Sequence, residues 1–294
     1  MIATEERNLV EPGPRVIEET WSARRGKDKP DEKRLMAEYC ANHEFLVRKG
    51  SNPERDPRET VASILVNQGT TPNVVVEEAL SWIAKNPERG PFDITWYTPG
   101  HLVPSTLRSF RLEHSHLSAA TQLFLFPGRV DQQTEAVSGP EAESFAERLE
   151  RRFTYAFLSA NSLDIHTGTV YFHLPEEVRL QKACATRYAA HKCLFLDSSK
   201  FKSEGEIGYG IEELLDKSEA VTIYTVSSDK DRWIKAKFDT LGGKILEASR
   251  VSSAVDPDVD QVDMKTLRLR IVGRNGVPTE CREHKGFLRP TQRN

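Results

Sequence analysis

The stretch Cys193-Leu194-Phe195-Leu196-Asp197 decides the fold, together with Ala220-Val221-Thr222-Ile223-Tyr224-Thr225 further along the chain. Both stretches are almost entirely apolar, and a helix-like segment of mixed character separates them. Strands that are apolar on both faces are typical of a parallel sheet with a layer of helices on each side. These two stretches therefore predict neighbouring central strands of such a sheet.

The same alternation of strands and helices extends outward in both directions. Further strands are predicted at residues 60–67, 93–98, 122–126, 155–160 and 243–246, and an edge strand at 265–273. Helices are predicted at residues 33–47, 74–83, 101–112, 140–152, 176–190, 204–214 and 230–241. The sequence thus predicts an α/β fold, an open and mostly parallel sheet with helices on both faces. Such sheets bind ligands at the carboxyl ends of their strands.

Composition excludes several classes of protein. The 294 residues are 38% hydrophobic and 29% charged, as expected for one large domain or two small ones. No apolar run approaches the roughly 18 residues that span a bilayer, and the first residues carry glutamates where a signal peptide is basic and apolar. The four cysteines lack CxxC spacing and need no disulfide framework. We therefore expect a cytoplasmic protein with no membrane association.

Charge is unevenly distributed along the chain. The net charge is -3, but residues 265–294 hold eight Lys/Arg against only Glu280 and Glu283. A basic segment on an acidic body contacts nucleic acid or an acidic partner in some proteins. The density of cations here is low, so we interpret the segment as a solvated tail or a terminal strand.

The first candidate site is the turn Gly69-Thr70-Thr71, between a predicted strand and a predicted helix. Glycine lets the backbone approach a ligand, the threonines add hydroxyl groups, and the helix start offers free N–H groups and the positive end of its dipole. These properties fit a phosphate-binding turn. An ordinary capped turn has the same sequence features. The GxxxxGK[ST] spacing of a P-loop is missing.

The second candidate is Asp197-Ser198-Ser199-Lys200, at the end of the decisive strand. A lysine at this position neutralises a phosphate, and an aspartate accepts hydrogen bonds from sugar hydroxyls. The alternative is again a capped turn, in which Asp197 satisfies the next backbone N–H groups and Lys200 is solvated.

The third candidate is Asn161-Ser162-Leu163-Asp164, which follows another predicted strand. Asp164 is placed to hold a hydroxyl, to act as a base, or simply to cap the loop. His114 and His116 have no partners at ligand spacing, and we interpret them as surface residues. No GxSxG, HExxH or Cys/His pairing is present, so we predict no metal and no cofactor.

The order of these weak motifs is more informative than any one of them. Along the chain stand DEKRLMA (31–37), GTT (69–71), FPGRV (126–130), VSGP (137–140), FLSA (157–160), EEVR (176–179) and DSSKF (197–201). This series resembles the C-terminal sensor domain of DeoR-family bacterial transcription regulators over residues 31–248. The resemblance implies a fold similar to the sugar-phosphate isomerase and CoA-transferase group.

The resemblance also implies a ligand and its site. Sensors of this family bind a phosphorylated sugar or a related metabolite, which changes the DNA affinity of an attached domain. It implies Gly69, Thr70 and Thr71 as the phosphate turn, Lys200 as a ligand contact, and Asp164 as the aspartate of the family's G-I-D stretch. Three segments depart from the family pattern: Ser162 replaces the glycine of G-I-D, Thr98-Pro99-Gly100 replaces T-N-S, and Pro127-Gly128 replaces a double glycine.

The segments outside the resemblance complete the expected organisation. We expect a poorly packed leader at 1–30, the sensor domain at 31–248, and a C-terminal extension with a basic edge strand at 249–294. A winged helix-turn-helix needs roughly 50–60 residues, which the first thirty do not supply. DNA is therefore expected to be reached only through a partner or an absent domain.

Three functions remain open from the sequence. The first is a sensor that binds a phosphorylated sugar-like metabolite and acts through a homo-oligomer or a partner. The second is a sugar-phosphate isomerase, with Asp164 or Glu176 as the proton-transfer base and Lys200 as the electrostatic stabiliser. The third is a scaffold whose ligand pocket has decayed, which the Thr98-Pro99-Gly100 and Pro127 departures favour.

Overall fold

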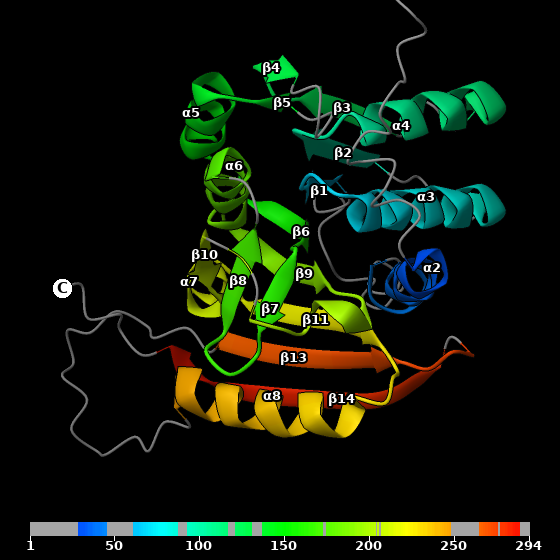
Figure 1. Cartoon of the computed structure of the whole chain (residues 1–294). Coiled ribbons are helices and arrows are strands. Elements are labelled where there is room, and N and C mark those ends of the chain that lie inside the picture. Colours follow the sequence, from blue (N-terminus) through cyan, green and yellow to red (C-terminus); the bar gives the residue numbers. More distant parts are fainter. Residues whose placement is uncertain are drawn as a thin grey trace, which may run out of the picture.

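A single nine-stranded sheet forms the centre of the computed structural model (Figure 1). The structure describes residues 29–45, 61–87, 93–116, 121–130, 137–172, 175–203, 205, 207–247, 265–275 and 277–288. The strands lie in the order β12 (Leu246–Glu247), β14 (Pro278–Leu288), β13 (Lys265–Val272), β11 (Ala220–Val226), β9 (Ala189–Phe195), β6 (Phe153–Ser159), β1 (Val61–Val66), β2 (Asp93–Thr98) and β3 (Thr121–Leu125).

Most neighbouring strands of this sheet are parallel. Every pair from β13 through to β3 is parallel, and only β14 and β12 run antiparallel to their neighbours. The predicted fold class is therefore confirmed. The segment 265–273 is the strand β13, as predicted, but it is not at the edge, because β14 and β12 pair beyond it.

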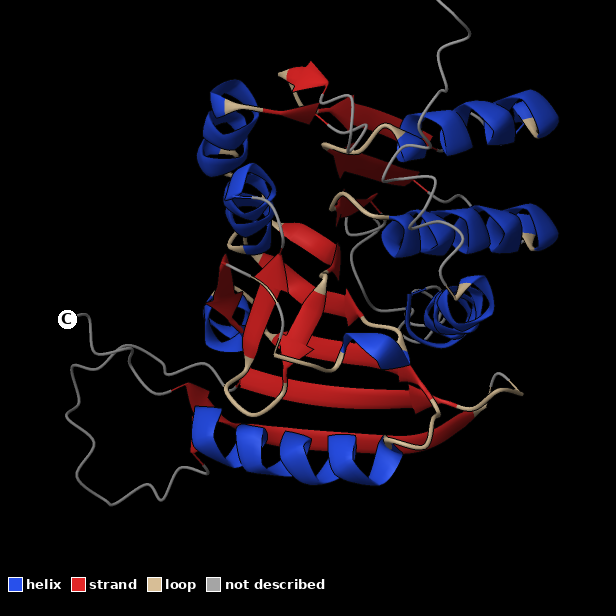
Figure 2. Ribbon diagram, viewed as in Figure 1, coloured by secondary structure: helices blue, strands red, loops and turns tan. Residues whose placement is uncertain are grey.

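Helices cover both faces of the sheet (Figure 2). One face carries α2 (Pro30–Tyr39), the π-helical turn η1 (Cys40–Phe45), α3 (Thr70–Lys85) and α4 (Leu102–Glu113). The other face carries α5 (Pro140–Arg148), α6 (Pro175–Ala185), α7 (Ile211–Asp216) and α8 (Asp231–Ile245). Each layer buries its own hydrophobic core against the sheet.

The alternation of side chains along β6 shows how one strand serves both cores. Tyr155 and Phe157 belong to the core under α2, α3 and α4. Ala156 and Leu158 point the opposite way, into the core under α5 to α8. Successive side chains of a strand alternate between faces, so a strand that is apolar at every position must be covered twice.

Two small sheets lie outside the main one, and the sequence did not predict them. β7 (Ser162–Asp164), β8 (Thr169–Phe172) and β10 (Ile207–Gly210) form an antiparallel sheet, and β4 (Arg129–Val130) pairs with β5 (Val137–Ser138). The helix predicted at 204–214 is therefore wrong in its first half. A Cβ on Gly208 would overlap the Val170 carbonyl, so glycine lets β10 lie close against β8.

Two further boundaries differ from the prediction. The helix predicted at 176–190 ends at Ala185, and β9 already begins at Ala189. The strand predicted at 243–246 is mostly the last turn of α8, which continues through Gly242 and Gly243. A Cβ on Gly242 would overlap the His284 ring, so this glycine allows the helix to lie close to β14. Gly242 therefore does not end the helix but allows it to pack closely against β14.

Several predicted segments fall outside the part of the chain that the structure describes. Residues 1–28 contain nearly all of the predicted leader, and residues 248–264 contain the predicted domain boundary at 248/249. The described helices include none that is long and apolar enough to cross a membrane.

Candidate functional site

The carboxyl ends of β1 and β6 form the edge at which the first predicted site lies. These strands are parallel neighbours, with Leu65 opposite Ala156. Gly69 is the N-cap of the 16-residue helix α3, and no side chain caps that end. The first N–H groups of a helix have no partner within the helix. This end of α3 therefore offers backbone donors and the positive end of the helix dipole.

Gly69 is required at this turn by both conformation and space. Its φ of 150° lies in the region that favours glycine. A Cβ there would overlap the Ser159 hydroxyl oxygen and would lie 3.2 Å from Cδ of Pro72. The two threonines that follow differ in access, because Thr70 is half-buried and Thr71 is only 2% exposed.

The backbone before Gly69 is fixed by three polar side chains. The Gln68 carbonyl accepts hydrogen bonds from Ser159 Oγ at 3.3 Å and from Gln181 Nε2 at 3.2 Å. The Gln68 N–H donates to Oδ1 of buried Asn67 at 2.9 Å. These contacts join β6 and α6 to the turn.

Lys200 lies at the same strand edge, in the short 3₁₀ helix η6 (Ser198–Lys200). Its Nζ donates to the Ala160 carbonyl at 2.6 Å and lies 4.0 Å from Asp197 Oδ2. Ala160 directly follows Ser159, which contacts the Gln68 turn. The structure therefore links the Gly69 turn and Lys200 through Ser159, the last residue of β6, and Ala160, which follows it. With 21% of its side chain exposed, Lys200 remains accessible to a ligand.

Asp164 occupies a different environment, as the last residue of β7 before the hairpin turn to β8. Its Oδ1 accepts a hydrogen bond from the His166 N–H at 2.8 Å. Burial raises the pKa of Asp164, but hydrogen bonds from Ser203 and the His166–Thr167 turn lower it, so the pKa lies below its ordinary value. This turn packs against α8, where a Cβ on Gly168 would lie 2.9 Å from Leu241. Asp164 thus caps a turn, one of the roles considered from the sequence.

Asp197 is also engaged in a cap. Its Oδ1 accepts from the Ser199 N–H at 3.1 Å and from the Ser199 hydroxyl. Ser198 is bound by the start of α2, since Glu32 Oε2 accepts from the Ser198 N–H at 2.9 Å and Lys29 Nζ donates to its hydroxyl at 2.5 Å. These contacts could not be predicted from the sequence, because they join residues far apart in the chain.

Two of the departures from the family pattern, Thr98-Pro99-Gly100 and Pro127-Gly128, lie in turns that follow the described strands β2 and β3. Thr98 Oγ1 accepts a hydrogen bond from the Gly100 N–H at 2.9 Å, and the Pro99 carbonyl accepts from the Val137 N–H at 2.9 Å. Gly128 has a φ of 143°, and a Cβ there would lie 2.8 Å from the Ser138 carbonyl oxygen. Both turns therefore form specific contacts of their own.

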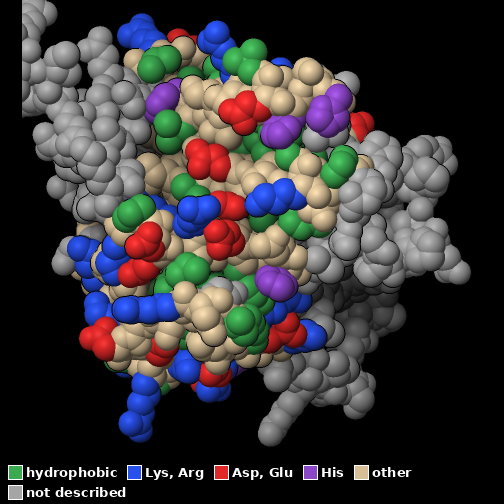
Figure 3. Space-filling model, turned by 90° about the vertical axis from the view of Figure 1, so that its right-hand side faces the viewer, with side chains coloured by type: hydrophobic (Ala, Val, Ile, Leu, Met, Phe, Trp, Pro, Cys, Tyr) green, Lys and Arg blue, Asp and Glu red, His purple; other side chains and the backbone are tan. Residues whose placement is uncertain are grey.

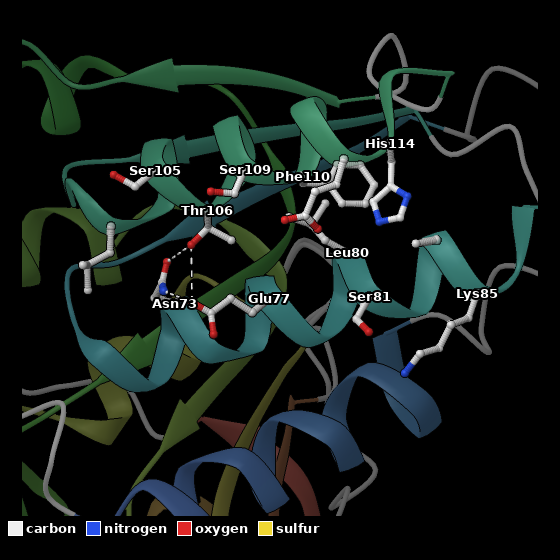
Figure 4. A pocket seen from close by; sticks show the side chains of 13 residues that line it. Asn73, Glu77, Leu80, Ser81, Lys85, Ser105, Thr106, Ser109, Phe110 and His114 are labelled. Carbon is white, nitrogen blue, oxygen red and sulfur yellow. Dashed lines mark hydrogen bonds between the residues drawn. The ribbon is translucent and has the colours of Figure 1, made fainter.

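A groove of about 700 Å³ lies between α3 and α4 (Figure 4). Asn73 Nδ2 donates to Glu77 Oε1 at 2.7 Å, and Thr106 Oγ1 donates to Asn73 Oδ1 at 3.2 Å, so these polar groups satisfy one another. Glu77 and Glu113 line the groove together with Lys85 and His114, so its lining holds side chains of both charges and is not a purely basic phosphate site. Sequence reasoning missed this groove, because no single motif marks it.

The charges of the surface are mixed. Figure 3 shows Lys/Arg side chains interspersed with Asp/Glu side chains on the face that it displays. The basic C-terminal segment is similarly balanced: Arg268 pairs with Glu283 at 2.6 Å, and Arg282 pairs with Asp239 at 3.2 Å. Paired cations are less available to phosphates, which favours the terminal-strand interpretation of this segment.

Residues 110–227 match the family model described as the DeoR C terminal sensor domain. The predicted resemblance is thereby confirmed over this range, which contains Asp164 and Lys200 and begins after Gly69–Thr71. A sensor domain of this type indicates a regulatory role in which an effector is sensed. No protein of curated function matches the chain.

Solved structures similar to this chain include ribose 5-phosphate isomerases. That of Methanocaldococcus jannaschii aligns with a TM-score of 0.36 and 12% identity, over 59% of this chain and 55% of that one. That of Plasmodium falciparum aligns with a TM-score of 0.35 and 11% identity, over 60% of this chain and 55% of that one. This chain thus spans about half the length of these isomerases, and a similarity this low says nothing about activity.

Proposed function

We propose that this protein is a metabolite sensor that binds a phosphorylated sugar or a related effector and regulates transcription through an oligomer or a partner. The observation that carries the proposal is the uncapped start of α3 at Gly69, linked to Lys200 through Ser159 and Ala160. The phosphate would accept hydrogen bonds from the first N–H groups of α3.

Lys200 supplies the counter-charge in this account. Its ammonium is held by the neutral Ala160 carbonyl at 2.6 Å, while the Asp197 carboxylate lies 4.0 Å away. A phosphate at the edge would be a stronger partner than a carbonyl, because charge-assisted hydrogen bonds are roughly twice as strong as neutral ones. Lys200 would then join the phosphate and the strand end.

An isomerase of phosphorylated sugars is the second candidate, and the Asp164 geometry disfavours it. A general base works best with a pKa near the operating pH. The pKa of Asp164 is lowered, and its Oδ1 already accepts a hydrogen bond within its own turn. A sensor needs no such base.

A second copy of the chain is the partner that the sheet edge fits best. β3 is the last strand of the nine, and Phe124 and Leu125 on it are 48% and 50% exposed. Unpaired edge strands with exposed apolar side chains tend to pair with another strand. DNA would be contacted by a partner or by a further domain, and the site of action would be the cytoplasm.

The proposal is tested with a thermal-shift panel of sugar phosphates, their unphosphorylated parents and inorganic phosphate. A ligand at 100 times its dissociation constant stabilises the fold by about 2.7 kcal/mol, which is readily measured. Stabilisation by a sugar phosphate but not by its parent sugar is the expected result. An isomerase assay on the same compounds separates sensing from catalysis. If no phosphorylated compound raises the melting temperature, the proposal fails, and a scaffold with a decayed pocket becomes the better account.

A further inference from the structure

Gln181, on α6, places a buried carboxamide against the turn that precedes Gly69. Gln181 is 1% exposed, and its Nε2 donates a hydrogen bond to the Gln68 carbonyl at 3.2 Å. Its backbone carbonyl also lies 3.5 Å from Asn67 Nδ2. Its side-chain Oε1 has no hydrogen-bond partner among the residues that the structure describes.

The orientation of this carboxamide is fixed by its neighbour. A carbonyl oxygen only accepts hydrogen bonds, so the atom of Gln181 that faces Gln68 must be the NH₂ group. Oε1 is then an acceptor beside the same turn, because both atoms belong to one planar group. Buried polar atoms in folded proteins are almost always paired, so an acceptor in this position calls for a donor.

A second side-chain amide at this edge, that of Asn161, has a donor group without an acceptor in the described part of the chain. Asn161 directly follows Ala160, whose carbonyl holds Lys200. Its side-chain Nδ2 is buried and has no acceptor among the described residues. The edge therefore carries one unmatched acceptor and one unmatched donor. A hydroxyl group both donates and accepts, whereas an ionised phosphate only accepts.

We propose that Gln181 is a specificity residue whose Oε1 accepts a hydrogen bond from a hydroxyl group of the bound ligand. This inference rests on the proposed function, because it places the phosphate of the same ligand at the start of α3. It narrows the ligand class to phosphorylated compounds with hydroxyl groups near the phosphate. A simple phosphate ester without hydroxyls accepts hydrogen bonds from the first N–H groups of α3 but offers no donor to Gln181 Oε1. It is therefore expected to bind more weakly.

The experiment compares binding preferences in wild type and in Gln181→Met. Calorimetry gives dissociation constants for ribose 5-phosphate, fructose 6-phosphate and glucose 6-phosphate, with ethyl phosphate as the probe that lacks hydroxyls. Wild type is expected to prefer at least one sugar phosphate over ethyl phosphate. In Gln181→Met this preference falls by about tenfold, while the affinity for ethyl phosphate stays within about twofold.

Matched variants separate a binding effect from a folding effect. Gln122→Met makes the same substitution at an exposed position on β3, and it is expected to leave all affinities unchanged. If Gln181→Met does not fold, Gln181→Asn keeps the amide but withdraws it by one methylene, and the same loss of preference is expected.

The possible failures are distinguishable. If wild type binds no phosphorylated probe, the proposed function itself fails, and the inference fails with it. If wild type binds sugar phosphates and Gln181→Met keeps the full preference over ethyl phosphate, the inference is overturned while the proposed function stands. In that case Oε1 is satisfied by a structural water rather than by the ligand.

Discussion

Lys200 Nζ lies 2.6 Å from the carbonyl oxygen of Ala160, one residue beyond the Ser159 hydroxyl that contacts the Gln68 turn. A lysine from one strand end is thereby held at the end of the neighbouring strand, close to the start of α3. The Asp197 carboxylate lies 4.0 Å from the same ammonium. A phosphate would form a stronger, charge-assisted hydrogen bond than the carbonyl does.

Replacing this ammonium is expected to weaken the binding of phosphorylated ligands specifically. Lys200→Met removes the charge and keeps most of the side-chain volume, so we expect at least about tenfold weaker binding of sugar phosphates. Titration calorimetry measures the effect. Lys202→Met, at an exposed position two residues along, is the control and should bind normally. Equal affinities of Lys200→Met and wild type would remove Lys200 from the site.

Gly69→Ala is expected to destabilise the protein. The substitution imposes a Cβ at a φ of 150° and against the Ser159 hydroxyl, at a cost of about 1–3 kcal/mol in the free energy of unfolding. Denaturant unfolding measures this loss. Gly243→Ala is the control, because a Cβ at that helical position meets nothing within 4 Å and should stabilise by roughly 0.5–1 kcal/mol.

The cause of the Gly69→Ala effect is tested by a second substitution. Ser159→Ala removes the hydroxyl that the new Cβ would overlap, and the double variant is expected to recover part of the lost stability. Strictly additive losses would show that backbone conformation alone makes glycine necessary at this turn.

A buried lysine predicts a pH dependence of stability. Lys192 is fully buried in β9, where burial lowers the pKa of its amine from 10.5 to about 7. Between these two values the unfolded chain binds a proton that the folded chain does not bind. The free energy of unfolding therefore falls as pH falls from about 10.5 to about 7, and this contribution is constant below that range.

Lys192→Met is expected to flatten this part of the stability profile and to raise stability at neutral pH by the order of a few kcal/mol. The Leu214 carbonyl, which Lys192 Nζ contacts at 2.8 Å, keeps a donor in the Ser218 hydroxyl at 2.9 Å. Urea unfolding between pH 7 and 10 checks the prediction. Lys244→Met removes an exposed lysine near the end of α8 whose charge does not act on Lys192, and it should retain the wild-type profile. An unchanged slope in Lys192→Met would contradict the account.

The contact between α2 and the Ser198 turn is expected to contribute to stability. Glu32→Ala removes the acceptor of the Ser198 N–H and hydroxyl, and a loss of about 1–2 kcal/mol in the free energy of unfolding follows. Glu38→Ala, on the same helix, removes only an exposed pair with Arg34 and should cost less than about 0.5 kcal/mol. Similar losses in both variants would show that the Ser198 contact contributes no more to the free energy of unfolding than an exposed ion pair does.

The main sheet was predictable from the sequence because its strands are buried on both faces. A strand such as β11, which is buried at all seven positions, must lie in the interior of a sheet that is covered by helices on both faces. β14 was not predictable in the same way, because it carries many charged side chains. They fit a strand because they pair with the neighbouring strand, as Glu283 does with Arg268 on β13. Cross-strand pairing is a property of register, which the sequence does not state directly.

The candidate site was predictable only in part, for a related reason. Gly69 and Lys200 follow predicted strands, and parallel topology brings such positions to one edge. Gln181 contacts Gln68 across 113 positions in the chain, from a helix whose sequence gives no sign of the contact. The role of Asp164 depended on a hairpin that the sequence reading missed. Local motifs therefore predicted which strand ends come together, but not the side-chain contacts between them.

Backbone amide resonances locate ligand binding at the start of α3. Isotope-labelled protein is titrated with inorganic phosphate and with ribose 5-phosphate, fructose 6-phosphate and glucose 6-phosphate. If the phosphate binds at the start of α3, the Gly69, Thr70 and Thr71 amide signals move with the sugar phosphates, as N–H groups do when they donate to an anion. Signals that move only along the groove between α3 and α4, or that do not move at all, would contradict the proposed phosphate site.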